Sequence, residues 1–184
     1  MRTPVAVFAL ALSVTCLPSS VSFADEVGAI EEKHLAMQPI GHVRKPDDRT
    51  LIVLDEIYQP GLLGLEDFSH IHVFWWFDRN DTAEKRQVLQ VHPMGDPENP
   101  LTGVFATRSP RRPNLIAVTL CKIASVRDNV VEVEKIDAFD GTPVLDIKPF
   151  LPGHDSASDA RVPDWVERAS ERRRSKREGE REGE

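Results

Sequence analysis

Residues 69–77 of the chain read SHIHVFWWF, and the alternation of side chains in this run decides the expected fold. Ile71, Val73, Trp75 and Phe77 share one side of an extended chain, because successive side chains of a strand point to opposite faces. Large rings occupy the opposite side as well. The run therefore predicts a strand that is buried on both faces, or one that holds a ligand on its second face.

Further apolar runs of strand length lie on both sides of this segment and are separated by Gly and Pro. They cover residues 51–54, 87–91, 115–123, 129–136 and 144–147. Helical periodicity is weak throughout this part of the chain. Because closure of a sheet removes the unpaired edges that promote aggregation, the series predicts a mainly β protein, a small closed or nearly closed β-barrel with short helical segments.

The length of 184 residues and the hydrophobic content of 40% suit one soluble domain with a proper core. The strand patterns place this domain at residues 39–155. Polar residues 25–38, which are poor in core side chains, are expected to form a linker. Residues 156–184 form a charged tail, which is nearly all charged from residue 167 on and is expected to be either a solvated helix or disordered.

The first 24 residues predict an export signal. Arg2 provides a basic start, residues 5–17 are almost continuously apolar, and the small residues Ser22 and Ala24 suit cleavage after Ala24. The mature protein is then expected to be periplasmic or secreted. An uncleaved anchor is one alternative, and translation from Met37, which would leave a cytoplasmic protein, is another.

The formal net charge of the chain is -7, and removal of residues 1–24, which contain Arg2 and no acid, changes it to about -8. Phosphate neutralisation supplies most of the affinity of nucleic-acid-binding proteins. An acidic chain binds RNA only if its Lys and Arg residues gather on one face, so composition leans slightly against an RNA partner.

Two other kinds of site receive little support from the sequence. Cys121 lies alone in an apolar strand pattern and is expected to be a buried small hydrophobe rather than a nucleophile. His70 and His72 share a strand face, and a metal site with His92 or His154 as a third ligand is conceivable by residue type. Packing and hydrogen bonding account for these histidines more simply, so no metal is predicted.

Two segments carry more polar residues than a plain core requires. Residues 103–114 read GVFATRSPRRPN, in which three arginines and two prolines predict a stiff loop that presents cations. This loop is either a solvated surface turn or an anion site, since an arginine fork pairs with a carboxylate or phosphate. Residues 136–149 read IDAFDGTPVLDIKP, and the Asp-Gly pair in them predicts a tight turn between two strands.

Four stretches in this order resemble the signature motifs of the TrmO/TsaA-like family: FSH at 68–70, GVFATRSP at 103–110, RPN at 112–114 and DGTPVLDIKP at 140–149. The resemblance implies a small TsaA-like β-barrel that binds S-adenosylmethionine, unlike the common Rossmann methyltransferases, and that often forms a homodimer. It also implies a tRNA substrate, because the best-known reaction of the family methylates N6 of threonylcarbamoyladenosine, next to the anticodon.

The resemblance also implies a set of cofactor-binding residues, while it assigns no catalytic base and no metal ligand. Arg108 suits the methionine carboxylate, and Asp140 is the one acid considered as a base. The implied cofactor contacts are Asp78, Arg79, Arg108, Val118, Asp140, Gly141, Thr142 and Pro143.

The chain departs from the family pattern in three places. The Pro-Arg-Gln segment that follows the first strand in longer members is missing, Asp78 stands where the family has His, and Ala117 replaces a Gly. Asp78 puts an acid near a ligand that carries a carboxylate. The alternative function is therefore an exported domain that keeps the fold as a small-molecule-binding or structural module without tRNA methylation.

Overall fold

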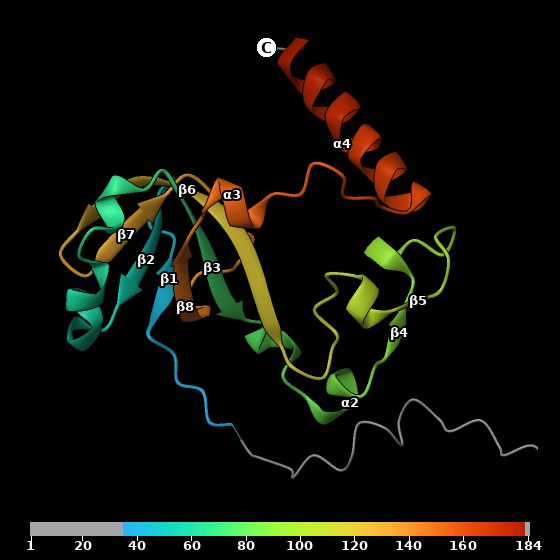
Figure 1. Cartoon of the computed structure of the whole chain (residues 1–184). Helices are drawn as coiled ribbons and strands as arrows, with labels where there is room; N and C mark the ends of the chain where they lie inside the picture. Colours follow the sequence, from blue (N-terminus) through green and yellow to red (C-terminus); the bar gives the residue numbers. More distant parts are fainter. Residues whose placement is uncertain (1–34, 183–184) are drawn as a thin grey trace, which may run out of the picture. The chain divides into compact units, whose positions relative to one another are not determined.

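The structure, a computed structural model, describes residues 35–182, and its ordered elements belong to the compact unit Met37–Glu184. The expected export signal at residues 1–24 lies outside the described residues, as does most of the expected linker. Six strands form a closed barrel in the order β1-β2-β7-β6-β3-β8, as Figure 1 shows. Their bounds are β1 Gly41–Arg44, β2 Thr50–Leu54, β3 His70–Trp76, β6 Ile116–Arg127, β7 Val130–Val133 and β8 Pro143–Pro149. Each neighbouring pair is antiparallel, so the expected closed β-barrel is confirmed.

Strand β3 has the alternation predicted from residues 69–77, but only one of its faces is buried and the other is partly exposed. Ile71 and Val73 are fully buried inside the barrel, and Trp75 is almost fully buried. The indole Nε1 of Trp75 donates a hydrogen bond of 3.0 Å to Thr119 Oγ1, so the ring enters the core without leaving a polar group unpaired. The other five strands complete the interior with Val43, Ile52, Leu54, Ala117, Cys121, Val131, Val133 and Val144.

The sequence patterns missed the strand that closes the barrel. Strand β1 has four residues, of which only Gly41 and Val43 are buried, so its alternation is too short to be recognised. Gly41 pairs with Leu54 of β2 on one side and with Val144 of β8 on the other. The remaining strand predictions needed adjusted ends, because β6 extends to Arg127 and β7 is shorter than residues 129–136.

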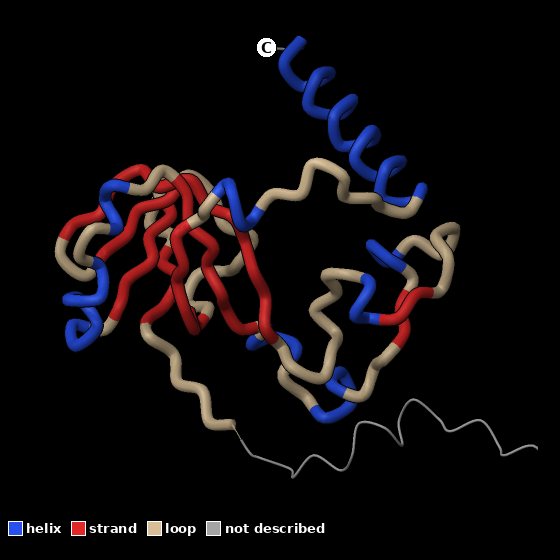
Figure 2. Tube along the Cα trace, in the orientation of Figure 1, coloured by secondary structure: helices blue, strands red, loops and turns tan. Residues whose placement is uncertain are grey.

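Residues 87–115 lie between β3 and β6 and are named here the β4–β5 lobe. Its two strands, β4 Gln90–Val91 and β5 Thr102–Gly103, form a separate small sheet. The expected strand at 87–91 is wrong in its first half, because helix α2 (Ala83–Arg86), which the Thr82 hydroxyl caps by accepting from Lys85 N, runs to the start of this segment. Short 3₁₀-helices occupy much of the remaining chain, and Figure 2 draws them in blue with the other helices. They are η1 Glu56–Leu62, η2 Leu65–Asp67, η3 Asp78–Asn80, η4 Pro93–Gly95 and η5 Val104–Ala106.

The chain continues after the barrel into two helices. Helix α3 (Pro152–Asp155) follows β8 directly, and Asp155 Oδ2 accepts a hydrogen bond of 2.7 Å from Leu151 N at its start. Helix α4 (Asp164–Glu182) is highly charged, which makes most of the expected tail a helix rather than disordered. Across residues 35–182, no helix combines the length and apolar character that a bilayer crossing requires.

Gly41 occupies a position where the barrel has no room for a side chain. A Cβ at this residue would lie 2.2 Å from Val53 O and 2.6 Å from Leu54 Cα, both of which belong to the paired backbone of β2. We expect Gly41→Ala to lower the free energy of unfolding by about 1 to 3 kcal/mol, the usual cost of overpacking a filled site. Urea denaturation measures this. Gly61→Ala is the matched control, since nothing lies within 4 Å of its added Cβ, and equal stability of the two variants would contradict the prediction.

Candidate functional site

One end of the barrel gathers most of the residues expected to contact a cofactor. Strand β3 ends there in the turn η3, which carries Asp78 and Arg79, and the segment that leads into β8 lies beside it. The Thr142 hydroxyl, which is buried, donates to Asp78 Oδ1 at 3.5 Å, the outer limit of a hydrogen bond. The guanidinium carbon of Arg79 lies 3.7 Å from the centre of the Phe139 ring. Two segments about 60 residues apart are thereby joined into one surface.

The turn at residues 140–143 is held against the end of β1. Gly141 adopts a φ of 81°, which glycine accepts without strain, and its N–H donates to Val43 O at 2.8 Å. Val43 N in turn donates to Thr142 O at 2.9 Å. Asp140 Oδ1 accepts a hydrogen bond of 2.8 Å from Lys45 N. Since this carboxylate anchors the turn to the barrel, Asp140 is a poor choice for the proton-accepting base.

Val118 lies on the outer face of the barrel rather than in the cluster at its end. It pairs with Phe74 of β3, whereas the rung nearest to Asp78 is the pair Trp76 and Ile116. Val118 borders a surface groove of about 720 Å³. The groove is lined by His72, Phe74, Val118, Ile147, Lys148, Pro149, Leu151 and Asp155.

Arg108 is exposed on a loop in the last part of the β4–β5 lobe. Arg112 folds this loop back on itself, because its Nη1 donates to the carbonyl oxygens of Thr107 and Ser109 at 3.4 and 3.3 Å. Within residues 35–182, no hydrogen bond or ion pair joins Arg108 to Asp78, Arg79 or the turn at 140–143. Six of the eight expected contacts therefore meet at the barrel end. Val118 lies on the outer face, and Arg108 is not bonded to the six.

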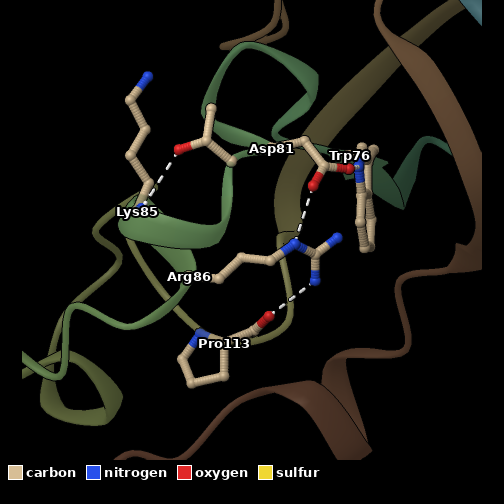
Figure 3. Close-up of polar contacts among 6 residues, drawn as sticks. Trp76, Asp81, Lys85, Arg86 and Pro113 are labelled. Carbon is tan, nitrogen blue, oxygen red and sulfur yellow. Dashed lines mark hydrogen bonds and ion pairs between the residues drawn. The ribbon is translucent and has the colours of Figure 1, made fainter.

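A second polar cluster, which sequence patterns did not reveal, connects the end of β3 to the arginine-rich loop at residues 103–114 (Figure 3). Asp81 accepts a hydrogen bond of 3.1 Å from Trp76 Nε1 and one of 2.8 Å from Arg86 Nε. Arg86 Nη1 also donates to Pro113 O at 3.0 Å, and its guanidinium lies 5.3 Å from the centre of the Trp76 ring. Arg86, followed by Trp76, holds the pKa of the Asp81 carboxyl below its ordinary value.

A further cavity of about 380 Å³ lies where the η1 and η2 turns meet the barrel, and it contains none of the expected site residues. Its lining is mainly apolar, with Leu54, Leu62 and Phe68 among the contributors. The groove beside Val118 is also largely apolar. Six of the eight expected contact residues are instead at the barrel end, so the side chains locate the candidate site better than the hollows do.

The histidines and Cys121 have structural partners. Ser69 Oγ lies 2.9 Å from His70 Nδ1, and His72 Nε2 lies 3.7 Å from Asp155 Oδ2. No group of three or more His, Cys, Asp or Glu residues is arranged to hold a metal ion in the described part of the chain. Burial raises the pKa of the Cys121 thiol to about 12, so this residue stays protonated and is a core side chain, as expected.

The closed antiparallel barrel, with opposite charges and a glycine turn at one end, defines a small β-barrel protein and excludes a doubly wound dinucleotide fold. Residues 31–156 match the tRNA-methyltransferase O N-terminal domain, and the chain belongs to this family.

Similar proteins of two kinds are known. A probable S-adenosyl-L-methionine-binding protein of Methanocaldococcus jannaschii is 46% identical over 114 residues, which cover 62% of this chain and 90% of that protein. A mouse tRNA (adenine(37)-N6)-methyltransferase is 41% identical over 101 residues, which cover 55% of this chain but only 23% of the mouse protein. The crystal structure of TrmO from Pseudomonas aeruginosa superimposes with a TM-score of 0.57 at 28% identity, and the match covers 73% of this chain and 63% of the solved one.

The Asp81 cluster gives a prediction for the pH dependence of stability. A carboxyl with a depressed pKa stabilises the folded state above its unfolded pKa, and this contribution is lost as the pH falls through the folded pKa. We therefore expect Asp81→Asn to lower the urea midpoint at pH 6 and to remove part of the fall in midpoint that the wild type shows below about pH 4. Asp159→Asn, an exposed change of the same charge, is the control. Parallel pH profiles for wild type and Asp81→Asn would contradict the prediction.

Proposed function

We propose that this protein is an S-adenosylmethionine-dependent methyltransferase that acts on adenosine in tRNA, at N6 of threonylcarbamoyladenosine beside the anticodon. Membership of the tRNA-methyltransferase O N-terminal domain family carries this proposal. It is supported by relatives that are named S-adenosyl-L-methionine-binding proteins and by others that are named tRNA (adenine(37)-N6)-methyltransferases.

The candidate contact residues fit the cofactor chemically. Arg79 and Arg108 offer cationic forks to a carboxylate, and neither is in an ion pair within residues 35–182. Nothing lies within 4 Å of the place where a Cβ of Gly141 would be, so a ligand can approach the backbone there. The apolar surface around Phe74 and Val118 suits the flat face of a purine.

The reaction needs positioning more than covalent catalysis. S-adenosylmethionine supplies a methyl group on a positively charged sulfur; the S–C bond breaks as an N–C bond forms, the sulfur keeps the electron pair, and the acceptor nitrogen loses a proton. The protein must hold donor and acceptor in line and provide a proton acceptor. Asp140 is already engaged by Lys45 N, so this carboxylate is not assigned as the proton acceptor.

The distribution of charge supports an RNA substrate despite the acidic composition. Residues 99–127 contain five Lys and Arg residues and no Asp or Glu, in a chain whose formal net charge is -7. Arg108, Arg111 and Arg112 lie together in this stretch, on the loop held by Arg86. A local cationic surface of this kind is what binding of a phosphate backbone requires.

We also propose that two copies of the chain associate. Ile116 and Leu120 are exposed apolar side chains on the outer face of β6. In the β4–β5 lobe, Leu89 and Phe105 are also exposed, at 58% and 78%. Exposed apolar side chains on both segments favour an interface between two copies of the chain. We expect a dimer in sedimentation equilibrium that Leu120→Glu shifts toward monomer, whereas Ile57→Glu, at an exposed residue of η1, leaves it unchanged; a monomeric wild type would contradict the proposal.

The second candidate function is an exported module that binds a small molecule without methylating tRNA. The expected export signal at residues 1–24 and the acid at Asp78 favour it. Transfer of a labelled methyl group from S-adenosylmethionine to tRNA that carries threonylcarbamoyladenosine separates the two candidates. Ligand binding without transfer would support the module, whereas transfer to this nucleoside would support the methyltransferase.

The binding site itself is tested with the cofactor or its demethylated product. We expect calorimetry to detect binding by the isolated protein and expect Arg108→Ala to weaken it by about 1.5 to 3 kcal/mol, the range for a hydrogen bond to a charged partner. Arg127→Ala, at the far end of β6, is the control, because it removes the same positive charge. Absence of binding at millimolar ligand would reject the methyltransferase, and binding that Arg108→Ala leaves unchanged would reject only the role of Arg108.

A further inference from the structure

Arg79 is held in an unusual way for a surface arginine. Its guanidinium lies 3.7 Å from the centre of the Phe139 ring, and no carboxylate in the described residues forms an ion pair with it. The ring itself is 57% exposed, so it is not simply part of the core. An exposed phenylalanine next to an arginine without an acidic partner calls for a reason beyond packing.

The backbone on both sides of this contact is fixed. Lys85 Nζ donates a hydrogen bond of 2.8 Å to Arg79 O, which secures η3. Thr142 N donates to Phe139 O at 3.2 Å, and the next residue, Asp140, is bonded to Lys45 N. The ring and the guanidinium therefore meet between two anchored segments, and little conformational freedom remains to be lost when a ligand binds.

An aromatic ring that covers the guanidinium leaves its N–H donors free. A carboxylate partner would occupy two of the five donors, whereas a ring attracts the cation through its π-electrons and accepts none of them in a conventional hydrogen bond. Arg79 thus presents an oriented and uncommitted fork, which suits the two oxygens of a ligand carboxylate.

The neighbouring residue adds the opposite charge. Asp78 precedes Arg79 in η3, and the single polar contact of its carboxylate in the described structure is the 3.5 Å approach of Thr142 Oγ1. A carboxylate beside a guanidinium complements a ligand that carries an ammonium and a carboxylate on one carbon. A phosphodiester would be attracted by Arg79 and repelled by Asp78, so the pair favours an α-amino acid group over RNA phosphate.

The family resemblance implies that Asp78 and Arg79 contact the cofactor. We propose that Phe139 is the positioning residue that orients Arg79, so that Arg79 receives the carboxylate and Asp78 the ammonium of the cofactor's amino-acid end. The inference rests on the proposed function. It gives the acid at position 78 a role in binding, where the sequence had suggested a conflict with the ligand carboxylate. Arg79 thereby joins Arg108, which the resemblance implied, as a partner of the ligand carboxylate.

The test compares S-adenosylhomocysteine with 5′-methylthioadenosine, which keeps the nucleoside and lacks the amino-acid end. Phe139→Leu preserves apolar bulk and removes the aromatic ring. We expect it to lower the affinity for S-adenosylhomocysteine by about 5- to 30-fold in calorimetry. Its affinity for 5′-methylthioadenosine should stay within about twofold of wild type, and Phe139→Tyr should restore binding of S-adenosylhomocysteine. Thermal unfolding of each variant checks that the barrel is intact.

A double variant separates orientation of Arg79 from other effects of the ring. In the Arg79→Lys background, which keeps the charge and loses the fork, Phe139→Leu should add less than about twofold. The inference would be overturned if Phe139→Leu lowered the affinity equally in the wild-type and Arg79→Lys proteins, or equally for both ligands. Unchanged binding by Phe139→Leu would overturn it as well. Failure of the wild type to bind either ligand would instead reject the proposed function, and this inference with it.

Discussion

Closure of the barrel by β1 is the interaction on which the rest of the structure depends. This strand of four residues pairs with β2 along its length and with β8 only near its start, at Gly41 and His42. Beyond that point the same edge continues into two backbone hydrogen bonds between Val43 and the turn at residues 140–143. The bonds that remove the last open edge of the sheet therefore also shape the candidate site. The turn could not keep its geometry in an open sheet, because its partners would not be in place.

The candidate site is marked by charged side chains that lack an ion pair, and not by the net charge of the chain. The chain carries 30 acids against 23 Lys and Arg residues, yet several acids near the barrel end already have partners. Asp140 accepts from Lys45 N, and Asp81 accepts from Arg86 and Trp76. Asp78 and Arg79 are left without an ion pair in the described structure. A ligand can bind charged groups of this kind without first breaking an existing ion pair.

The barrel also suits a nucleoside cofactor in a way that differs from the doubly wound folds. Those folds bind dinucleotides at a glycine-rich loop before a helix, where the helix end favours phosphate. Helices near this site are short, α2 having four residues, and the proposed ligand carries a carboxylate instead of a pyrophosphate. A rigid turn with a glycine, an oriented guanidinium and an apolar strand face serve this different charge pattern. The function thus depends on the residues of the site, and the barrel fold alone does not determine it.

The sequence by itself determined the class of the fold and the family. The alternation in residues 69–77 predicts β3 correctly, because burial of one face depends only on local spacing. The four motifs indicate the family through residue identity and order alone. Strand β1 was missed because its four residues form a strand only through their partners β2 and β8. Tertiary structure alone decided that Phe139 lies against Arg79, that Asp140 is an anchor and that Val118 faces outward, since each depends on contacts between segments far apart in the chain, and local patterns carry no record of such contacts.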